Sequence, residues 1–407
     1  MATVLFCPVT FNLAETTRMI EVARALDPRH RAVFMGYEDD FVSLIADAGF
    51  EYRACTPSWS AAEREQALKF DQGKALRSPF TKELVAERVA VERALIREVD
   101  AKAIVIGSNI TSQISARAEH VPLFYPVPFA LTRPQVEQTR HMGFVRGSGR
   151  LARAADRVAS AAFRWTYNHA PLAPRAFSRV ARDNGVAPLR TVASLLDADV
   201  NLLTVLPSEL DGYDIPSHYE RVGPIFARLD TPLPVIVEEL AAGPEPLVYL
   251  GLGSSASREL ALAAAAQLGT LPISVIAPIA HYLEPGDTVP GNVHVTGLLP
   301  AHRLGGLVDA AVLHGGQGTV QTACATGIPF VGIGLQPEQV WNVRVCVSAG
   351  NALALTQKEA ATPLLAAAVE RLLNEGTFRD AASRVQREAE GADGAAASAR
   401  LIEARLG

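Results

Sequence analysis

His314-Gly315-Gly316-Gln317-Gly318-Thr319 is the stretch of sequence that decides the fold. It follows the apolar run Ala311-Val312-Leu313, which predicts a buried strand, and its glycines predict a tight turn into a helix. A helix that begins at such a turn directs unpaired backbone N–H groups toward an anion. The sequence therefore predicts that a nucleotide diphosphate binds at this turn.

Along the rest of the chain, short apolar runs alternate with longer amphipathic runs. This alternation is typical of α/β proteins, in which helices cover both faces of a parallel sheet. We expect strands at residues 4–8, 32–35, 103–106 and 123–125 in the first half, and at 247–250, 273–276, 293–295, 311–313 and 329–333 in the second. Helices are expected at about 13–26, 41–48 and 110–118. Two such series predict two Rossmann-like domains.

The length and composition agree with two domains. The chain has 407 residues, of which 49% are hydrophobic, and this suffices for two cores in domains of roughly 200 residues. Val222-Gly223-Pro224 marks a boundary, and the proline-rich, alanine-rich and acidic stretch after it is typical of a linker. We expect domains at 1–225 and 246–390, a linker at 226–245 and a final helical segment at 391–407.

Several classes of protein are disfavoured by composition. No run of about 18 apolar residues predicts a membrane span, and no signal peptide is evident at the N-terminus, so we expect a soluble cytoplasmic protein. The net charge of −5 argues against nucleic-acid binding. A homodimer is compatible with the sequence. Four scattered cysteines predict buried thiols and neither disulfides nor a metal site: Cys7, Cys55, Cys324 and Cys346.

Residues 140–190 are strongly basic, with Asp156 and Asp183 as their only acids and with Phe163, Trp165 and Tyr167 interleaved. Two interpretations fit this composition. One is a solvated helical hairpin that covers the first sheet, and the other is a lid over an apolar or acidic substrate.

The spacing from His314 to Pro329, and on to Glu338-Gln339 and Asn342, resembles the donor-binding motif of UDP-dependent glycosyltransferases with the GT-B fold. The similar group includes bacterial macrolide and natural-product enzymes of glycosyltransferase family 1. Further matches are Arg221-Val222-Gly223-Pro224, the strand and Gly-Ser turn at 247–254, and Gly291-Asn292-Val293 leading to Leu299-Pro300. The resemblance covers most of the chain but is dense only from about Arg221 onward.

The resemblance implies two facing Rossmann-like domains, with a helix near residues 394–406 that returns to brace the first. It implies transfer of a hexose from a UDP- or dTDP-sugar to a hydrophobic acceptor such as a polyketide or a phenolic natural product. The reaction would invert the anomeric centre and use neither a metal nor a cofactor besides the nucleotide sugar.

The same resemblance assigns the donor-binding residues. His314 donates to a phosphate, the three glycines of the turn allow close backbone approach, and Thr319 adds a hydroxyl and an N–H. Glu338 and Gln339 hold sugar hydroxyls. The full set is Ser254, Ser255, Leu298, Leu299, His314, Gly315, Gly316, Gln317, Gly318, Thr319, Glu338 and Gln339.

One of these residues departs from the family pattern. Leu298 stands where many members have a tryptophan that stacks on the base, and the backbone of Leu299 would read the edge of the base. Ser254 and Ser255 offer a second helix start in the crevice where open α/β sheets bind ligands. The choice between uridine and thymidine stays open.

The family's catalytic base is a histidine oriented by an aspartate, and this chain has neither residue at the corresponding positions. The histidine position corresponds to Glu15, and the aspartate position falls at Gly107-Ser108-Asn109. Glu15 is either the base that deprotonates the acceptor, with Asn12 and Asn109 beside it, or the second half of a capping box with Asn12. His141 and His169 are the alternative bases.

A second hypothesis belongs to another functional class. Loss of the dyad is compatible with a non-catalytic relative that binds a sugar nucleotide and serves as a partner or scaffold. Glu338 and Gln339 argue against it, because a scaffold has little need of contacts to sugar hydroxyls. A sugar-nucleotide epimerase of related form fits the spacing poorly.

Overall fold

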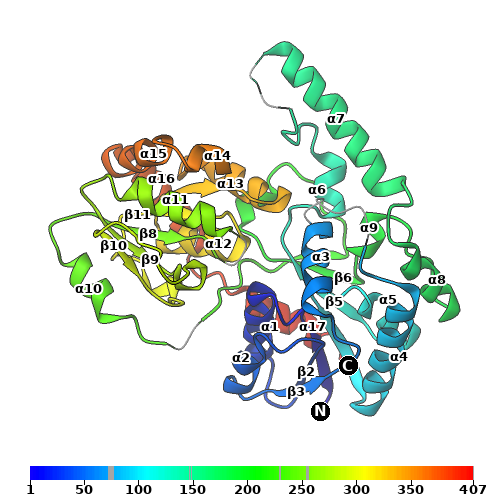
Figure 1. Cartoon of the computed structure of the whole chain (residues 1–407). Helices are drawn as coiled ribbons and strands as arrows, with labels where there is room; N and C mark the ends of the chain where they lie inside the picture. Colours follow the sequence, from blue (N-terminus) through cyan, green and yellow to red (C-terminus); the bar gives the residue numbers. More distant parts are fainter. Residues whose placement is uncertain (72–77, 146, 148, 229–230, 254–255, 407) are drawn as a thin grey trace. The chain divides into compact units, whose positions relative to one another are not determined.

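The computed structural model describes residues 1–71, 78–145, 147, 149–228, 231–253 and 256–406 (Figure 1). They form two compact units, of which the first comprises Met1–Ile225 and Asp393–Gly407 and the second Phe226–Ala392. Each unit is built on a parallel sheet with helices packed against it, so the predicted α/β class with two Rossmann-like domains is confirmed. Ser254 and Ser255 lie outside the described residues.

The sheet of the first unit has the strand order β3-β2-β1-β4-β5-β6-β7. Parallel strands are buried on both faces and therefore read as nearly continuous apolar runs, which is why most of them are visible in the sequence. Their bounds are β1 (Thr3–Cys7), β2 (Arg31–Gly36), β3 (Glu51–Ala54), β4 (Ala101–Ile106), β5 (Leu123–Val127), β6 (Val200–Leu203) and β7 (Tyr219–Arg221).

Most helices of the first unit follow its strands in the crossovers that parallel pairing requires. They are α1 (Leu13–Ala25), α2 (Val42–Asp47), α3 (Ala61–Asp71), α4 (Lys82–Glu98), α5 (Ser112–Ala118), α6 (Arg133–Gln138), α7 (Arg150–His169), α8 (Arg175–Asp183), α9 (Val192–Leu195) and the 3₁₀ turn η1 (Pro207–Leu210).

Alternate residues of β1 supply two separate cores, one on each face of the sheet. Val4 and Phe6 pack with helix α1, whereas Leu5 and Cys7 point to the opposite face and pack with residues of α4. This follows from the two-residue repeat of a strand. The strand is thereby fixed on both sides, and so is the loop that follows it.

The C-terminal helix α17 (Gly394–Glu403) belongs to the first unit, in agreement with the expected return of the chain. Ala399 and Ile402 are buried in the core that contains α1. A Cβ atom at Gly394 would lie 2.2 Å from the backbone oxygen of Gly223, so glycine permits this close approach. Glu403 also accepts a hydrogen bond from the backbone N–H of Asp27 at 2.7 Å.

The second unit has the strand order β10-β9-β8-β11-β12-β13. Its strands are β8 (Leu247–Gly251), β9 (Ser274–Ala277), β10 (Val293–Val295), β11 (Ala310–Leu313), β12 (Phe330–Ile333) and β13 (Ala352–Leu355). Its helices are α10 (Val235–Ala241), α11 (Arg258–Leu268), α12 (Gln317–Thr326), α13 (Pro337–Ala349), α14 (Gln357–Ala360), α15 (Leu364–Asn374) and α16 (Gly376–Ala389), with 3₁₀ turns η2 (Ala280–Tyr282) and η3 (Ala301–Arg303).

Two stretches differ in detail from the expectation. The segment expected as a linker at 226–245 contains α10, in which Val237 is fully buried, and it belongs to the second unit. The basic segment at 140–190 forms α7 and α8, but α7 packs mainly against α6 and α9 rather than across the sheet. Within the described ranges, no helix is long and apolar enough to cross a membrane.

Candidate functional site

In both sheets, the chain winds outward in two directions from one central strand pair. This pair is β8 and β11 in the second unit and β1 and β4 in the first. Open α/β sheets bind ligands in the crevice at the carboxyl ends of such a pair. The predicted donor-binding turn follows β11, and the loop that contains Ser108 follows β4. Both sets of predicted residues therefore lie at the edge of a sheet where open α/β folds generally bind ligands.

The ring of His314 is buried at the carboxyl end of β11 between two glycines. A Cβ atom at Gly316 would lie 2.3 Å from Nε2 of His314, and one at Gly253 would lie 2.6 Å from its Cε1. Neither position therefore accepts another residue without displacing the ring. On the opposite side, Nδ1 of His314 lies 3.3 Å from the backbone oxygen of Gly251.

This contact assigns the protons of the imidazole. A carbonyl oxygen only accepts, so Nδ1 of His314 carries a proton and Nε2 has none in the neutral ring. Burial lowers the pKa of His314, against a smaller opposing effect of the Gly251 hydrogen bond. The ring is therefore neutral near neutral pH, and it donates from Nε2 only after it takes up a second proton. A neighbouring phosphate favours that protonated form.

Helix α12 begins directly after the turn, and no side chain caps its start at Gly316. The N–H groups of a first helical turn have no partner within the helix, and the helix dipole makes the electrostatic potential at this end positive. Thr319 donates its hydroxyl to the backbone oxygen of Gly316 at 2.9 Å, so this hydroxyl braces the turn. A Cβ atom at Gly318 would meet nothing within 4 Å. The helix start therefore has space for an anion.

The first turn of α13 is tied to the glycine turn. Asn342 donates to the backbone oxygen of Gly315 at 3.1 Å and to Oε1 of Glu338 at 2.6 Å. A Cβ atom at Gly315, where φ is +81°, would lie 2.9 Å from the backbone oxygen of Gln339. The structure thus brings Glu338 and Gln339 beside the turn. Oε1 of Gln339 accepts from the backbone N–H of Leu335 at 3.0 Å.

The loop after β10 and the turn after β8 supply the remaining donor-side residues. Leu298 is 60% exposed, which suits contact with a flat base, whereas Leu299 is buried. Helix α11 begins at Arg258 with Ser257 as its cap, and not at Ser254-Ser255 as expected. The Tyr282 hydroxyl, which the sequence did not single out, contacts the backbone oxygen of Gly253 at 2.6 Å and the N–H of Ala256 at 3.1 Å.

In the first unit, Glu15 joins the loops that follow β1 and β4. Its Oε2 accepts from the backbone N–H groups of Val9 at 3.3 Å and Ser108 at 2.9 Å, and its Oε1 accepts from the Ser108 hydroxyl at 2.5 Å. Gly107 makes this contact possible, since a Cβ atom there would lie 2.0 Å from Oε2 of Glu15. The structure therefore brings together the two positions at which the family has its dyad.

The two asparagines have mainly structural contacts. Asn12 caps α1 by accepting from the N–H groups of Ala14 and Glu15. The reciprocal half of a capping box is not formed, because the N–H of Asn12 donates to Val9 at 2.8 Å instead of to Glu15. Asn109 is buried and donates to Oε1 of Glu92 at 3.4 Å. Ser108 rather than Asn109 therefore contacts Glu15.

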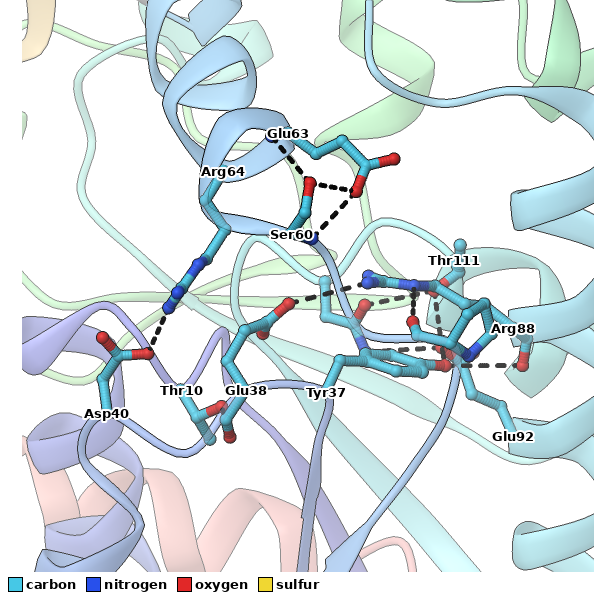
Figure 2. A network of polar contacts seen from close by, with 12 residues as sticks. Thr10, Tyr37, Glu38, Asp40, Ser60, Glu63, Arg64, Arg88, Glu92 and Thr111 are labelled. Carbon is cyan, nitrogen blue, oxygen red and sulfur yellow. Dashed lines mark hydrogen bonds and ion pairs between the residues drawn. The ribbon is translucent and has the colours of Figure 1, made fainter.

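Glu92 is the centre of a buried polar network (Figure 2). Its carboxylate accepts from the Tyr37 hydroxyl at 2.7 Å and from Thr111 at 2.5 Å, and burial raises its pKa. The Arg88 guanidinium lies over the Tyr37 ring at 3.8 Å and 3.6 Å from Glu38. These contacts fix α4 to the loops after β2 and β4, and Asn109 is part of that framework.

The alternative bases lie in the α6–α8 region. Nδ1 of His141 is 3.3 Å from Oδ2 of Asp156, which gives the geometry of an oriented imidazole. His169 is exposed at the end of α7, with its ring near that of Trp165. In the part of the chain that the structure describes, no three His, Cys, Asp or Glu side chains are grouped as metal ligands.

Comparisons with known proteins find similarity to glycosyltransferases. Residues 263–398 match the family model described as "Erythromycin biosynthesis protein CIII-like, C-terminal domain". The chain is 27% identical over 395 residues to a PGL/p-HBAD biosynthesis glycosyltransferase of Mycobacterium tuberculosis, covering 94% of this chain and 87% of that protein.

Solved structures show the same fold. The glycosyltransferase SnogD from Streptomyces nogalater has a TM-score of 0.67 at 21% identity, and the glycosyltransferase VinC, solved in complex with dTDP, has 0.68 at 18%. Both comparisons cover 99% of each chain. The chain therefore has the fold of the GT-B glycosyltransferases, and its similarity to proteins named glycosyltransferases supports a transferase enzyme.

The Gly318→Ala variant tests whether the start of α12 binds phosphate, because the substitution should affect donor affinity without destabilising the helix. Alanine stabilises a helix by roughly 0.5–1 kcal/mol relative to glycine, and its Cβ has free space here, so we expect stability to be unchanged or higher. If phosphate oxygens occupy that space, donor affinity falls about 10-fold, because crowding a filled site costs ~1–3 kcal/mol. Thermal melting and calorimetric titration with a nucleotide sugar measure the two effects. Unchanged affinity would exclude diphosphate from this helix start.

We expect the imidazole of His314 to take up a proton when the donor binds. The free ring has a lowered pKa and is neutral, and the diphosphate raises the pKa by favouring the imidazolium. Affinity therefore rises as pH falls through the interval between these two pKa values, and it is lowest above the pKa of the complex. Calorimetry in buffers of different ionisation enthalpy counts the protons. A nucleotide sugar is the ligand, because its diphosphate does not titrate near neutral pH. The linkage should vanish in His314→Asn.

Proposed function

We propose that this enzyme transfers a hexose from a UDP- or dTDP-sugar to a hydrophobic small molecule, such as a polyketide or a phenolic natural product, with inversion and without a metal. The observation that carries the proposal is the turn after β11. There a histidine that can be protonated, an uncapped helix start and an open space beside Gly318 meet at the central strand pair. All three favour a diphosphate.

The neighbouring groups support a sugar attached to that diphosphate. Glu338 is held against the glycine turn through Asn342, so a carboxylate lies next to the predicted phosphate position. A carboxylate there repels a second anion and suits hydroxyl donors. The similar structure of VinC was solved with dTDP, and the similar mycobacterial protein is named for PGL/p-HBAD biosynthesis. These names support a nucleotide donor and a hydrophobic acceptor for this chain.

The charge of the diphosphate is balanced in this proposal by the imidazolium of His314 and the dipole of α12. These groups take the role that a divalent cation has in many other phosphate sites. They also stabilise the negative charge that builds on the departing nucleotide diphosphate as the bond to the sugar breaks.

For the acceptor, we propose a two-step path for its proton. The Ser108 hydroxyl is exposed and donates to the buried carboxylate of Glu15 at 2.5 Å. As the acceptor oxygen bonds to the sugar carbon, its proton passes to Ser108, and the Ser108 proton passes to Glu15. Glu15 thus acts as the base through a hydroxyl that the acceptor contacts, in place of the family's histidine.

Turnover is tested with UDP- and dTDP-hexoses, a panel of polyketide and phenolic acceptors, and EDTA. We expect nucleotide diphosphate release that requires an acceptor, continues in EDTA and yields a glycoside with inverted configuration by NMR. If nucleotides raise the melting temperature but neither transfer nor slow donor hydrolysis occurs, a binding or scaffold role stands instead.

The proton path is tested by Ser108→Ala and Glu15→Gln. Each should lower kcat at least ~100-fold with donor affinity little changed, since each removes one step of general base catalysis. His141→Asn is the matched control and should leave kcat within a few-fold. Ser108→Ala keeps the backbone N–H that Glu15 accepts, so its melting temperature should be near that of the parent. A large loss in His141→Asn alone would place the base there.

A further inference from the structure

Helix α7 has an apolar stripe that no other element covers in the described structure. Leu151, Val158 and Trp165 are spaced seven residues apart and are 88%, 71% and 64% exposed. Residues seven apart lie on one face of a helix. The alanines at 154, 155, 161 and 162, all exposed, lie between them on this face. We refer to Leu151, Val158 and Trp165 as the α7 stripe.

The opposite face of α7 is anchored, which fixes the direction of the stripe. Asp156, Ser160 and Tyr167 are buried on that face. Tyr167 donates its hydroxyl to the backbone oxygen of Leu131 at 2.5 Å, and Ser160 accepts from the N–H of Met142 at 2.9 Å. Figure 1 shows α7 extending well beyond the sheet of its own unit. The stripe is therefore a fixed surface on a projecting helix.

Exposed arginines without side-chain partners among the described residues lie along α7 and at the start of α8, and Arg150 and Arg157 border the stripe on one side. In the described part of the chain, no side-chain hydrogen bond or ion pair involves the guanidinium groups of five exposed arginines: Arg150, Arg153, Arg157, Arg175 and Arg179. Most other arginines of this unit do form ion pairs, among them Arg31, Arg53, Arg93 and Arg117. The only acid in α7, Asp156, is buried and turned away.

A hollow of about 400 Å³ lies beside the end of α7 and combines the same two properties. Leu172, which follows the end of α7 at His169 and is 57% exposed, lines it together with Phe80. Arg175, Arg179 and Lys82 contribute positive charge, of which only Lys82 is paired, with Asp183 at 3.1 Å. An apolar surface thus continues into a basic hollow.

We propose that α7 and the start of α8 dock on the surface of a membrane that contains anionic lipids. Amphipathic helices that lie at such interfaces carry leucine and tryptophan on one face and arginines beside it. The stripe would contact the acyl boundary, and the arginines would contact lipid phosphates. A second copy of the chain fits poorly, because two α7 helices packed along their stripes would bring unpaired arginines together.

The test uses the full chain and vesicles of phosphatidylcholine, with and without phosphatidylglycerol, in a flotation assay. We expect binding to the mixed vesicles, little binding to phosphatidylcholine alone, and loss of binding at high salt. Leu151→Ser/Val158→Ser/Trp165→Ser should abolish flotation. Arg150→Glu/Arg157→Glu should lower partitioning at least ~10-fold, because each cation contributes roughly a factor of five near an anionic surface.

Two controls separate this surface from general stickiness and charge. Val235→Ser/Leu364→Ser removes exposed apolar residues of the second unit, and Arg384→Glu/Arg387→Glu reverses exposed charges on α16; both should float like the parent. Circular dichroism confirms that each variant folds. The proposal is overturned if the parent binds neither vesicle, or if the stripe variant floats like the parent. Self-association that depends on the stripe, without vesicle binding, would assign the surface to a second copy. None of these results depends on glycosyl transfer.

Discussion

The arrangement of the donor region depends on the packing of one imidazole ring against two backbones that lack Cβ atoms. Gly253 and Gly316 leave the width of the His314 ring between the β8 and β11 loops, and the Gly251 oxygen fixes the rotation of the ring. Because the ring leaves no room for a Cβ atom at Gly316, the residue at the N-cap of α12 has no side chain that could cap the helix. The position of the histidine and the exposure of the helix start therefore have one steric cause.

The two units differ in the charge of the side chains at the carboxyl ends of their central strand pairs. In the second unit, no side chain of the described residues caps α12, and its first turn contains no acidic residue. In the first unit, the carboxylate of Glu15 already accepts the N–H groups of both central loops. A carboxylate at this position disfavours a second anion, and Ser108, which donates to it, is an exposed residue. A division into donor and acceptor sides is thus consistent with one difference in charge.

Local patterns predicted much of this structure, and long-range contacts account for the rest. Apolar runs gave most strands, because parallel strands are buried on both faces. Strands β3, β6, β7 and β13 were not predicted; all four are short, and β3 and β7 also contain charged residues. Asn12-x-x-Glu15 fits a capping box, yet Glu15 contacts Ser108, 93 residues away, which no local pattern reveals. The start of α11 was misplaced because three serines at 254, 255 and 257 are equally suited to cap a helix. The seven-residue spacing in α7 is visible in the sequence, but whether another element covers that face depends on the tertiary structure.

The return of α17 has a consequence for how the chain is made. The second unit is one continuous segment, whereas the first is divided, and its core lacks Ala399 and Ile402 until the second unit has been synthesised. Domains generally fold as units and in order of synthesis. Here that order is inverted at the end, because the unit that emerges first from the ribosome is the last to be completed. Until α17 has been made, the face of α1 that packs against it lacks that partner.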